Sequence, residues 1–202
     1  SMRRIIVEKI PWLYACCDSL ITAEDIASAS RFQNDRRRTE HLAWRRVVRR
    51  ELGRNISIHY NEVGAPVVDT ENTYISVAHG AERVAVVISD QRVGIDIESL
   101  EREFDRVSSR YMSCEEQLLS DAEHWAAIVW CSKEALYKLY GKRGVNLIGD
   151  INIVDYNADN QQLRARIEQH TNAIVEVSVI DDIAVTAVAY FDNNIEENKN
   201  KE

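Results

Sequence analysis

The chain has 202 residues, of which 45% are hydrophobic and 29% are charged, and its formal net charge is −8. This composition is that of a globular domain with a sizeable core. No apolar run approaches the roughly 20 residues that a membrane-spanning helix needs, and the N-terminal residues do not follow a signal-peptide pattern. We therefore expect a cytoplasmic protein with no membrane partner.

The first half of the chain predicts a strand, two helices and then several short strands. Residues 3–10 alternate in hydropathy like a strand, and Thr22 with Asp25 predicts a helix that runs to about Phe32. Asn34 and Gly53 are suitable ends for a longer helix with one apolar side. The runs rich in β-branched residues that follow are 56–60, 74–78, 84–89 and 93–97.

The second half repeats this order of elements. A helix is predicted from about Phe104, and Ser113 with Glu116 forms a capping box before a long helix over 123–140. The strand-like runs are 151–156, 163–168 and 173–190, the last broken by a turn at Asp181 and Asp182. We therefore predict an α+β fold of two pseudo-duplicated halves, each a small antiparallel sheet packed with a long helix. The expected boundaries are 2–98, 99–191 and a disordered tail over 192–202.

One candidate site lies in the strand Val93-Gly94-Ile95-Asp96-Ile97-Glu98. Because a strand has a side-chain period of two, Asp96 and Glu98 share one face while the isoleucines enter the core. Two carboxylates this close repel each other, and a hard cation such as Mg²⁺ relieves that repulsion. Taken alone, the pattern is somewhat more typical of a solvated strand edge, because Asp-x-Glu is common.

A second candidate is Trp130-Cys131-Ser132-Lys133-Glu134-Ala135-Leu136-Tyr137-Lys138 on the long helix. Glu134 and Lys138 are four residues apart and so share one helix face. Such a pair is usually a surface salt bridge, and Trp130 is usually a core residue. Beside a strand with two carboxylates, however, Glu134 completes a possible metal site and Lys138 offers charge to a phosphate.

Histidine and arginine provide the remaining candidates. His79 ends the run Ile75-Ser76-Val77-Ala78-His79-Gly80, where it is placed to donate to a phosphate or to serve as a structural residue. An arginine-rich stretch in an otherwise acidic chain indicates an anionic partner. Its members are Arg36, Arg37, Arg38, Arg45, Arg46, Arg49, Arg50 and Arg54.

In chain order, the segment that ends at His79-Gly80, the strand with Asp96 and Glu98, and the helix segment with Glu134 and Lys138 resemble the signature motifs of the 4'-phosphopantetheinyl transferase superfamily. The length, the two similar halves and the motif spacing resemble its larger, monomeric surfactin-synthetase-activating type. The resemblance implies an enzyme with holo-acyl-carrier-protein synthase activity. Such an enzyme transfers phosphopantetheine from coenzyme A to a serine of an apo acyl or peptidyl carrier protein and releases adenosine 3',5'-bisphosphate. It also implies a monomer with Mg²⁺ as cofactor.

The resemblance assigns roles to residues by position. Asp96, Glu98 and Glu134 match the Mg²⁺ ligands, and Glu134 also matches a proposed base for the serine hydroxyl. Lys138 matches the lysine near the transferred phosphate, and His79 matches a histidine that contacts coenzyme A.

Further positions match residues that bind coenzyme A. Lys133 matches the other motif lysine, and Arg38 and Arg45 best fit the basic positions for the nucleotide. The chain departs from the family at Ala65 and Ala78, where lysine and serine are frequent. We therefore expect coenzyme A to bind more weakly or in a different arrangement.

Three other classes of function would explain some of these residues. A nucleic-acid-binding protein explains the arginines but not the carboxylates, so no nucleic-acid partner is expected. A magnesium-dependent phosphohydrolase would use the same carboxylates with water as nucleophile. A non-catalytic carrier-binding module is compatible with Ala65 and Ala78.

Overall fold

A computed structural model describes residues 2–12 and 18–193 of the chain. Its first elements are β1 (Arg3–Lys9), α1 (Ala23–Ala29), α2 (Asp35–Leu52), β2 (Ile58–Tyr60), β3 (Pro66–Val68), β4 (Tyr74–Gly80), β5 (Arg83–Ser89) and β6 (Val93–Ser99). They are followed by the 3-10 helix η1 (Asp105–Arg110), α3 (Cys114–Leu118), α4 (Trp125–Tyr140), β7 (Ile151–Asn157), β8 (Gln162–Ile167), β9 (Thr171–Ile180) and β10 (Ala184–Phe191). Residues 194–202 of the predicted tail lie outside the described residues.

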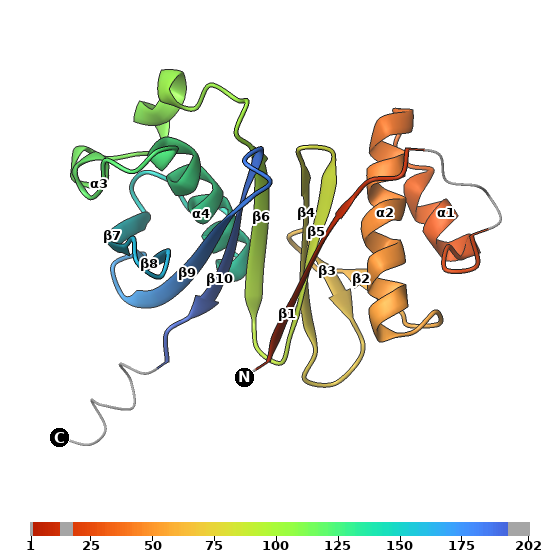
Figure 1. Ribbon diagram of the computed structural model, residues 1–202. Helices are drawn as coiled ribbons and strands as arrows, with labels where there is room; N and C mark the ends of the chain where they lie inside the picture. Colours follow the sequence, from red (N-terminus) through yellow and green to blue (C-terminus); the bar gives the residue numbers. More distant parts are fainter. Residues whose placement is uncertain (1, 13–17, 194–202) are drawn as a thin grey trace.

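The strands form antiparallel sheets that stand between two groups of helices. Three strands pair in the order β1-β5-β4, and five pair in the order β6-β10-β9-β8-β7. Figure 1 shows α1 and α2 on the outer side of the first sheet and α4 against the second. A two-stranded sheet, β2-β3, completes the first half. The predicted α+β fold, with a long helix packed on a small antiparallel sheet in each half, is confirmed.

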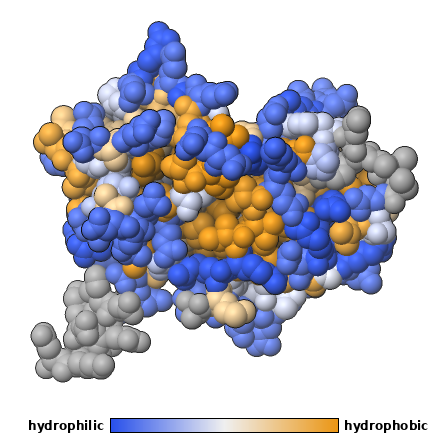
Figure 2. Space-filling view, in the orientation of Figure 1, coloured by the Kyte–Doolittle hydropathy of each residue, from blue (hydrophilic) through white to orange (hydrophobic). Residues whose placement is uncertain are grey.

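Strand β5 is buried on both faces. Val84, Val86 and Ile88 pack with α2, whereas Ala85 and Val87 pack with residues of β6 and β10. Because both faces are covered, the strand reads as a continuous apolar run rather than an alternating one. The face with Ala85 and Val87 joins the two halves of the molecule. Apolar side chains also reach the surface near the middle of the face seen in Figure 2.

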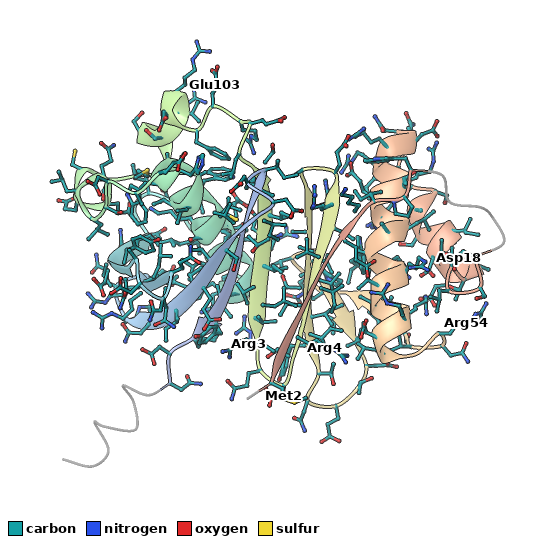
Figure 3. The ribbon with its side chains drawn as sticks, in the orientation of Figure 1. Met2, Arg3, Arg4, Asp18, Arg54 and Glu103 are labelled. Atoms are coloured by element: carbon teal, nitrogen blue, oxygen red, sulfur yellow. The ribbon has the colours of Figure 1, made fainter. Side chains whose placement is uncertain are left out.

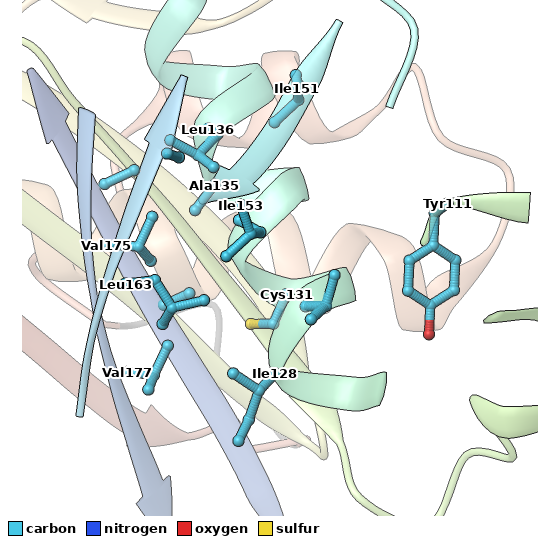
Figure 4. Close-up of a cluster of buried hydrophobic side chains, with 14 of the residues drawn as sticks. Tyr111, Ile128, Cys131, Ala135, Leu136, Ile151, Ile153, Leu163, Val175 and Val177 are labelled. Carbon is cyan, nitrogen blue, oxygen red and sulfur yellow. The ribbon is translucent and has the colours of Figure 1, made fainter. Parts of the chain in front are cut away.

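Helix α4 covers the largest buried cluster. Cys131, Ala135 and Leu136 of the helix pack against the sheet residues Ile153 and Leu163 (Figure 4). All five side chains are at most 4% exposed. Burying the apolar side of α4 in this way fixes which face it turns toward β6.

The helix ends follow local signals in the sequence. The capping boxes at Thr22 and Ser113 are both formed, and Asn34 accepts hydrogen bonds from the first turn of α2. Gly141 adopts the left-handed conformation that ends α4, with φ of 66°. The helix expected from Phe104 is instead the short 3-10 helix η1.

Strand β6 pairs with the strands of the second half. Its residues Val93–Ser99 form an antiparallel ladder with β10. The expected boundary at residue 98 therefore does not coincide with the sheet pairing. Within residues 2–12 and 18–193, no helix is long and apolar enough to cross a membrane.

Candidate active site

The site is built where strand β6 passes helix α4. Ile95 and Ile97 are 0% and 1% exposed in the core between the sheets, so Asp96 and Glu98 lie on the opposite face. A Cβ added to Gly94 would lie 2.1 Å from the carbonyl oxygen of Ala135 in α4. Glycine thus allows the backbones to approach closely, which brings the β6 carboxylates beside the motif residues of the helix.

Lys138 joins the two halves at this place. Its Nζ donates to the carbonyl oxygens of Val77 in β4 and Ile95 in β6, at 3.0 and 2.9 Å. It also lies 3.7 Å from Oδ1 of Asp96. The Ser76 hydroxyl accepts a hydrogen bond from the Ile95 N–H at 3.0 Å, so side chains connect β4 to β6.

The carboxylates at the site repel one another in a poorly solvated place. Burial raises the pKa of Asp96 to about 8, Lys138 opposes the rise, and Glu98 and Glu134 reinforce it. Burial also raises the pKa of Glu134. The positive charge of Lys138 opposes this rise, and the negative charge of Glu98 adds to it. Three carboxyl groups therefore share one region, and a positive ligand would stabilise their charged forms.

The carboxyl oxygens of Asp96, Glu98 and Glu134 are potential metal ligands. Oδ2 of Asp96 is buried and accepts no hydrogen bond from the described residues. Three carboxylates with such an orphaned oxygen have the donor chemistry that Mg²⁺ prefers. The described residues nevertheless contain no group of three metal-ligating side chains already arranged around one point.

Glu98 is held by partners that the sequence did not identify. Trp130 Nε1 donates to its Oε1 at 2.9 Å, and Arg102 Nη1 donates to its Oε2 at 2.8 Å. The indole of Trp130 therefore has a polar role beside its packing. The four-residue spacing between Glu98 and Arg102 was the available signal for the second contact.

His79 lies near the end of β4, in the first half of the molecule. Its Nδ1 lies 2.9 Å from Oε2 of Glu40 on α2, and its side chain is 55% exposed. A Cβ on the next residue, Gly80, would lie 2.5 Å from the carbonyl oxygen of Ile97, so the end of β4 adjoins β6. Glu40 was not anticipated, because a contact from α2 to β4 leaves no local pattern in the sequence.

Lys133 does not fit the expected role in binding coenzyme A. Its side chain is 0% exposed and pairs with Glu116 at 2.8 Å. Its Nζ also donates to the carbonyl oxygens of Tyr111 and Leu147. All of its donors point into the protein, so Lys133 ties α4 to its surroundings and offers no surface to a ligand.

Arg45 is also unavailable to a nucleotide. Its side chain is 1% exposed and forms an ion pair with Asp25 at 2.6 Å. Arg38 is half-buried, donates to the carbonyl oxygen of Phe32 and pairs with Asp35. Arg31 and Arg37 are exposed and lie over the Phe32 ring, 4.8 and 4.7 Å from its centroid.

A cavity of about 640 Å³ opens beside Lys138 between the two halves. The first half lines it mainly with apolar groups, and the second adds positive charge. Its lining includes Val63, Pro66, Ile75, Tyr137, Lys142 and Arg143. The cavity thus combines an apolar wall with cations that suit an anionic ligand.

Residues 92–188 match the family described as the 4'-phosphopantetheinyl transferase superfamily. The matched region contains Asp96, Glu98, Glu134 and Lys138, and it begins just before β6. The match supports the superfamily and, in general terms, a transferase that transfers phosphopantetheine. A search of curated proteins found no match.

Proposed function

We propose that this protein transfers the 4'-phosphopantetheine group of coenzyme A to a serine of an apo acyl or peptidyl carrier protein. The observation that carries the proposal is the meeting of Asp96, Glu98 and Glu134 with Lys138 inside the matched region. The two joined halves in one chain are consistent with the larger, monomeric type of this enzyme.

The reaction requires charge neutralisation and a base. The serine oxygen attacks the β-phosphorus of coenzyme A, the bond to the bridging pyrophosphate oxygen breaks, and adenosine 3',5'-bisphosphate leaves. Glu134, on the helix face that also carries Lys138, is the proposed acceptor of the serine proton. Lys138 is positioned to balance the negative charge that develops on the phosphate oxygens.

Mg²⁺ is part of the proposal. Asp96, Glu98 and Glu134 would hold the ion, which when bound would neutralise charge on the pyrophosphate of coenzyme A. The orphaned Oδ2 of Asp96 supports this assignment. The protein's own contribution is to hold these oxygens on one rigid strand and one rigid helix.

The proposed coenzyme A contacts differ from those expected. His79 and Lys138 remain candidates because both are accessible. Arg45 and Lys133 are replaced by the exposed Arg31 and Arg37, whose guanidinium groups have only ring contacts among the described residues. The cavity beside Lys138 offers space for another part of the same ligand.

A nucleic-acid function is less well supported by α2. Six of its arginines form ion pairs with acidic side chains, so most of the helix does not present a bare basic face. These are Arg36, Arg38, Arg45, Arg46, Arg49 and Arg50. We therefore propose a carrier protein, which is usually acidic, as the macromolecular partner.

Intact-protein mass spectrometry of apo carrier proteins tests the proposal. The carriers are incubated with coenzyme A and the protein, with Mg²⁺ or with chelator. We expect each substrate carrier to gain one phosphopantetheine only with Mg²⁺. Asp96→Asn and Glu134→Gln should each lower the rate about 100- to 1,000-fold. Glu103→Gln, which changes an exposed carboxylate, is the matched control and should leave the rate unchanged.

Three results would contradict this function. Full activity in both Asp96→Asn and Glu134→Gln would remove the carboxylates from the mechanism. Coenzyme A binding without transfer to any carrier would favour a non-catalytic carrier-binding module. Release of phosphopantetheine without a carrier would favour a hydrolase.

A further inference from the structure

Glu98 has a different partner on each carboxylate oxygen. Oε1 accepts the indole N–H of Trp130 at 2.9 Å, and Oε2 accepts a guanidinium N–H of Arg102 at 2.8 Å. The side chain of Glu98 is 14% exposed, whereas that of Arg102 is 56% exposed. The two contacts thus differ in how easily they can be broken.

The contact with Trp130 is rigid. The indole lies on α4, and the Tyr111 ring packs edge-on against it with centroids 5.0 Å apart. Tyr111 is in turn fixed by a hydrogen bond from its hydroxyl to the carbonyl oxygen of Ala126, at 2.8 Å. Moving Oε1 away from Trp130 would leave a part-buried donor unpaired, which opposes rotation of the carboxylate.

The contact with Arg102 is easily exchanged. Arg102 lies in the loop after β6, and exposed ion pairs of this kind contribute little to stability because water and salt screen them.

We propose that Arg102 is a displaceable counter-ion for Glu98, which a divalent cation replaces while Trp130 keeps the other oxygen in place. The inference rests on the proposed role of Asp96, Glu98 and Glu134 in holding that cation. It explains why the three carboxylates are neighbours without forming a ready-made metal site in the described part of the chain. Arg102 sets the affinity of the site, and Trp130 is a positioning residue.

Binding of Mn²⁺, measured by titration calorimetry or by the electron paramagnetic resonance of the free ion, tests this inference without any turnover. Arg102→Gln removes the competing cation, so we expect Mn²⁺ to bind about two- to fivefold more tightly. Arg102→Lys retains the charge and should bind like the parent. Raising the salt concentration should narrow the difference between Arg102→Gln and the parent, because salt screens an exposed pair.

Arg106→Gln is the matched control. Arg106, in η1, forms an exposed pair with Glu103 of the preceding loop, which Figure 3 labels. The substitution removes the same charge without touching Glu98, so Mn²⁺ affinity should not change. Equal tightening in Arg106→Gln would mean that net charge alone is responsible and would overturn the proposal.

Trp130→Phe tests the fixed contact. It removes the N–H donor but retains a ring against Tyr111, and we expect about tenfold weaker Mn²⁺ binding, the usual effect of losing such a hydrogen bond to a ligand. Trp44→Phe changes a buried tryptophan of the other half and should bind like the parent.

The proposed function and this inference fail in different ways. If the parent protein does not bind Mn²⁺, or if Asp96→Asn binds it equally well, the proposed metal site itself is wrong. If the parent binds Mn²⁺ through Asp96 but Arg102→Gln binds no more tightly, only the role of Arg102 is overturned.

Discussion

The two long helices, α2 and α4, both carry charge into the interior but treat it differently. On α2, Arg45 and Arg49 are each 1% exposed, and both donate to the carboxylate of Asp25, at 2.6 and 2.7 Å. Beside α4, Asp96 is 3.7 Å from Lys138 and keeps one oxygen without a hydrogen bond from the described residues.

The contrast separates two uses of buried charge. A buried ion pair whose atoms are all satisfied holds elements together, and losing one partner leaves an uncompensated charge. Burial raises the pKa of a carboxylate that lacks hydrogen-bond partners, and its charged form is stabilised only when a positive ligand binds. We therefore expect substitutions in the satisfied buried ion pairs to change stability and substitutions beside Asp96 to change transfer.

The largest expected effect on stability comes from Asp25→Asn. It leaves Arg45 and Arg49 buried without their shared carboxylate, so the free energy of unfolding should fall by about 3–5 kcal/mol. Denaturant titration measures this change. Asp18→Asn is the control, because its pair with Arg46 is partly exposed and should be worth about 0–1 kcal/mol. Similar losses in both variants would contradict the distinction.

Two lysines of α4 should behave in opposite ways. Lys138→Met should lower the transfer rate about 100- to 1,000-fold. Because Lys138 is partly exposed, its loss should lower the free energy of unfolding less than the loss of the fully buried Lys133. Lys133→Met leaves the Glu116 carboxylate buried without its cation, so it should lower the free energy of unfolding by about 3 kcal/mol. Transfer assays on the folded fraction, combined with denaturant titration, separate the two effects. A loss of transfer without a loss of stability in Lys133→Met would return that lysine to the active site.

A smaller effect is expected from Gly94→Ala. The new Cβ has no room beside Ala135, so β6 and α4 must separate, at a cost of about 1–3 kcal/mol and with reduced transfer. Gly149→Ala is the control, because no atom lies within 4 Å of the added Cβ. Thermal unfolding and the transfer rate measure both changes, and normal behaviour of Gly94→Ala would refute the close-approach argument.

The smallest expected effect is the pH dependence of stability that comes from His41 of α2. Burial and the charges of Arg45 and Arg31 lower the pKa of His41 to about 4, with Asp25 opposing them. Between pH 6.5 and 4 the unfolded chain therefore binds more protons at this residue, so its contribution to stability is complete above pH 6.5 and is lost as pH falls.

Thermal unfolding at pH 7 and pH 5 measures this dependence. We expect a loss on the order of 1 kcal/mol from His41, or about 2–4 °C for a chain of this size. His41→Gln does not titrate and should show a smaller decrease over the same range. An unchanged pH dependence in that variant would show that other groups are responsible.

Much of the fold was predictable because its signals are local. The capping boxes at Thr22 and Ser113, the stop at Gly141 and the turn at Asp181 and Asp182 each depend on neighbouring residues. The pairing of β6 with β10 was not predictable in this way, because it joins residues about 90 positions apart in the sequence.

The site also has some features that local signals predict and others that depend on distant residues. The side-chain period of two placed Asp96 and Glu98 on one face without any tertiary information. The burial of Arg45 depends on Asp25 in another helix, and the burial of Lys133 depends on Glu116 in a separate segment. Exposure of an arginine or lysine is decided by such distant partners, so motif position alone gave the wrong expectation for their surroundings.

The contact at Gly94 has a consequence for protein engineering. The separation of β6 and α4 is limited by backbone atoms, since the glycine stands directly against the Ala135 carbonyl. Residues deeper in the α4 core, such as Leu136 and Leu163, are not part of that contact. Libraries that vary these core positions at constant volume should alter thermal tolerance while the catalytic groups keep their spacing, so the core and the chemistry of this protein are separately adjustable.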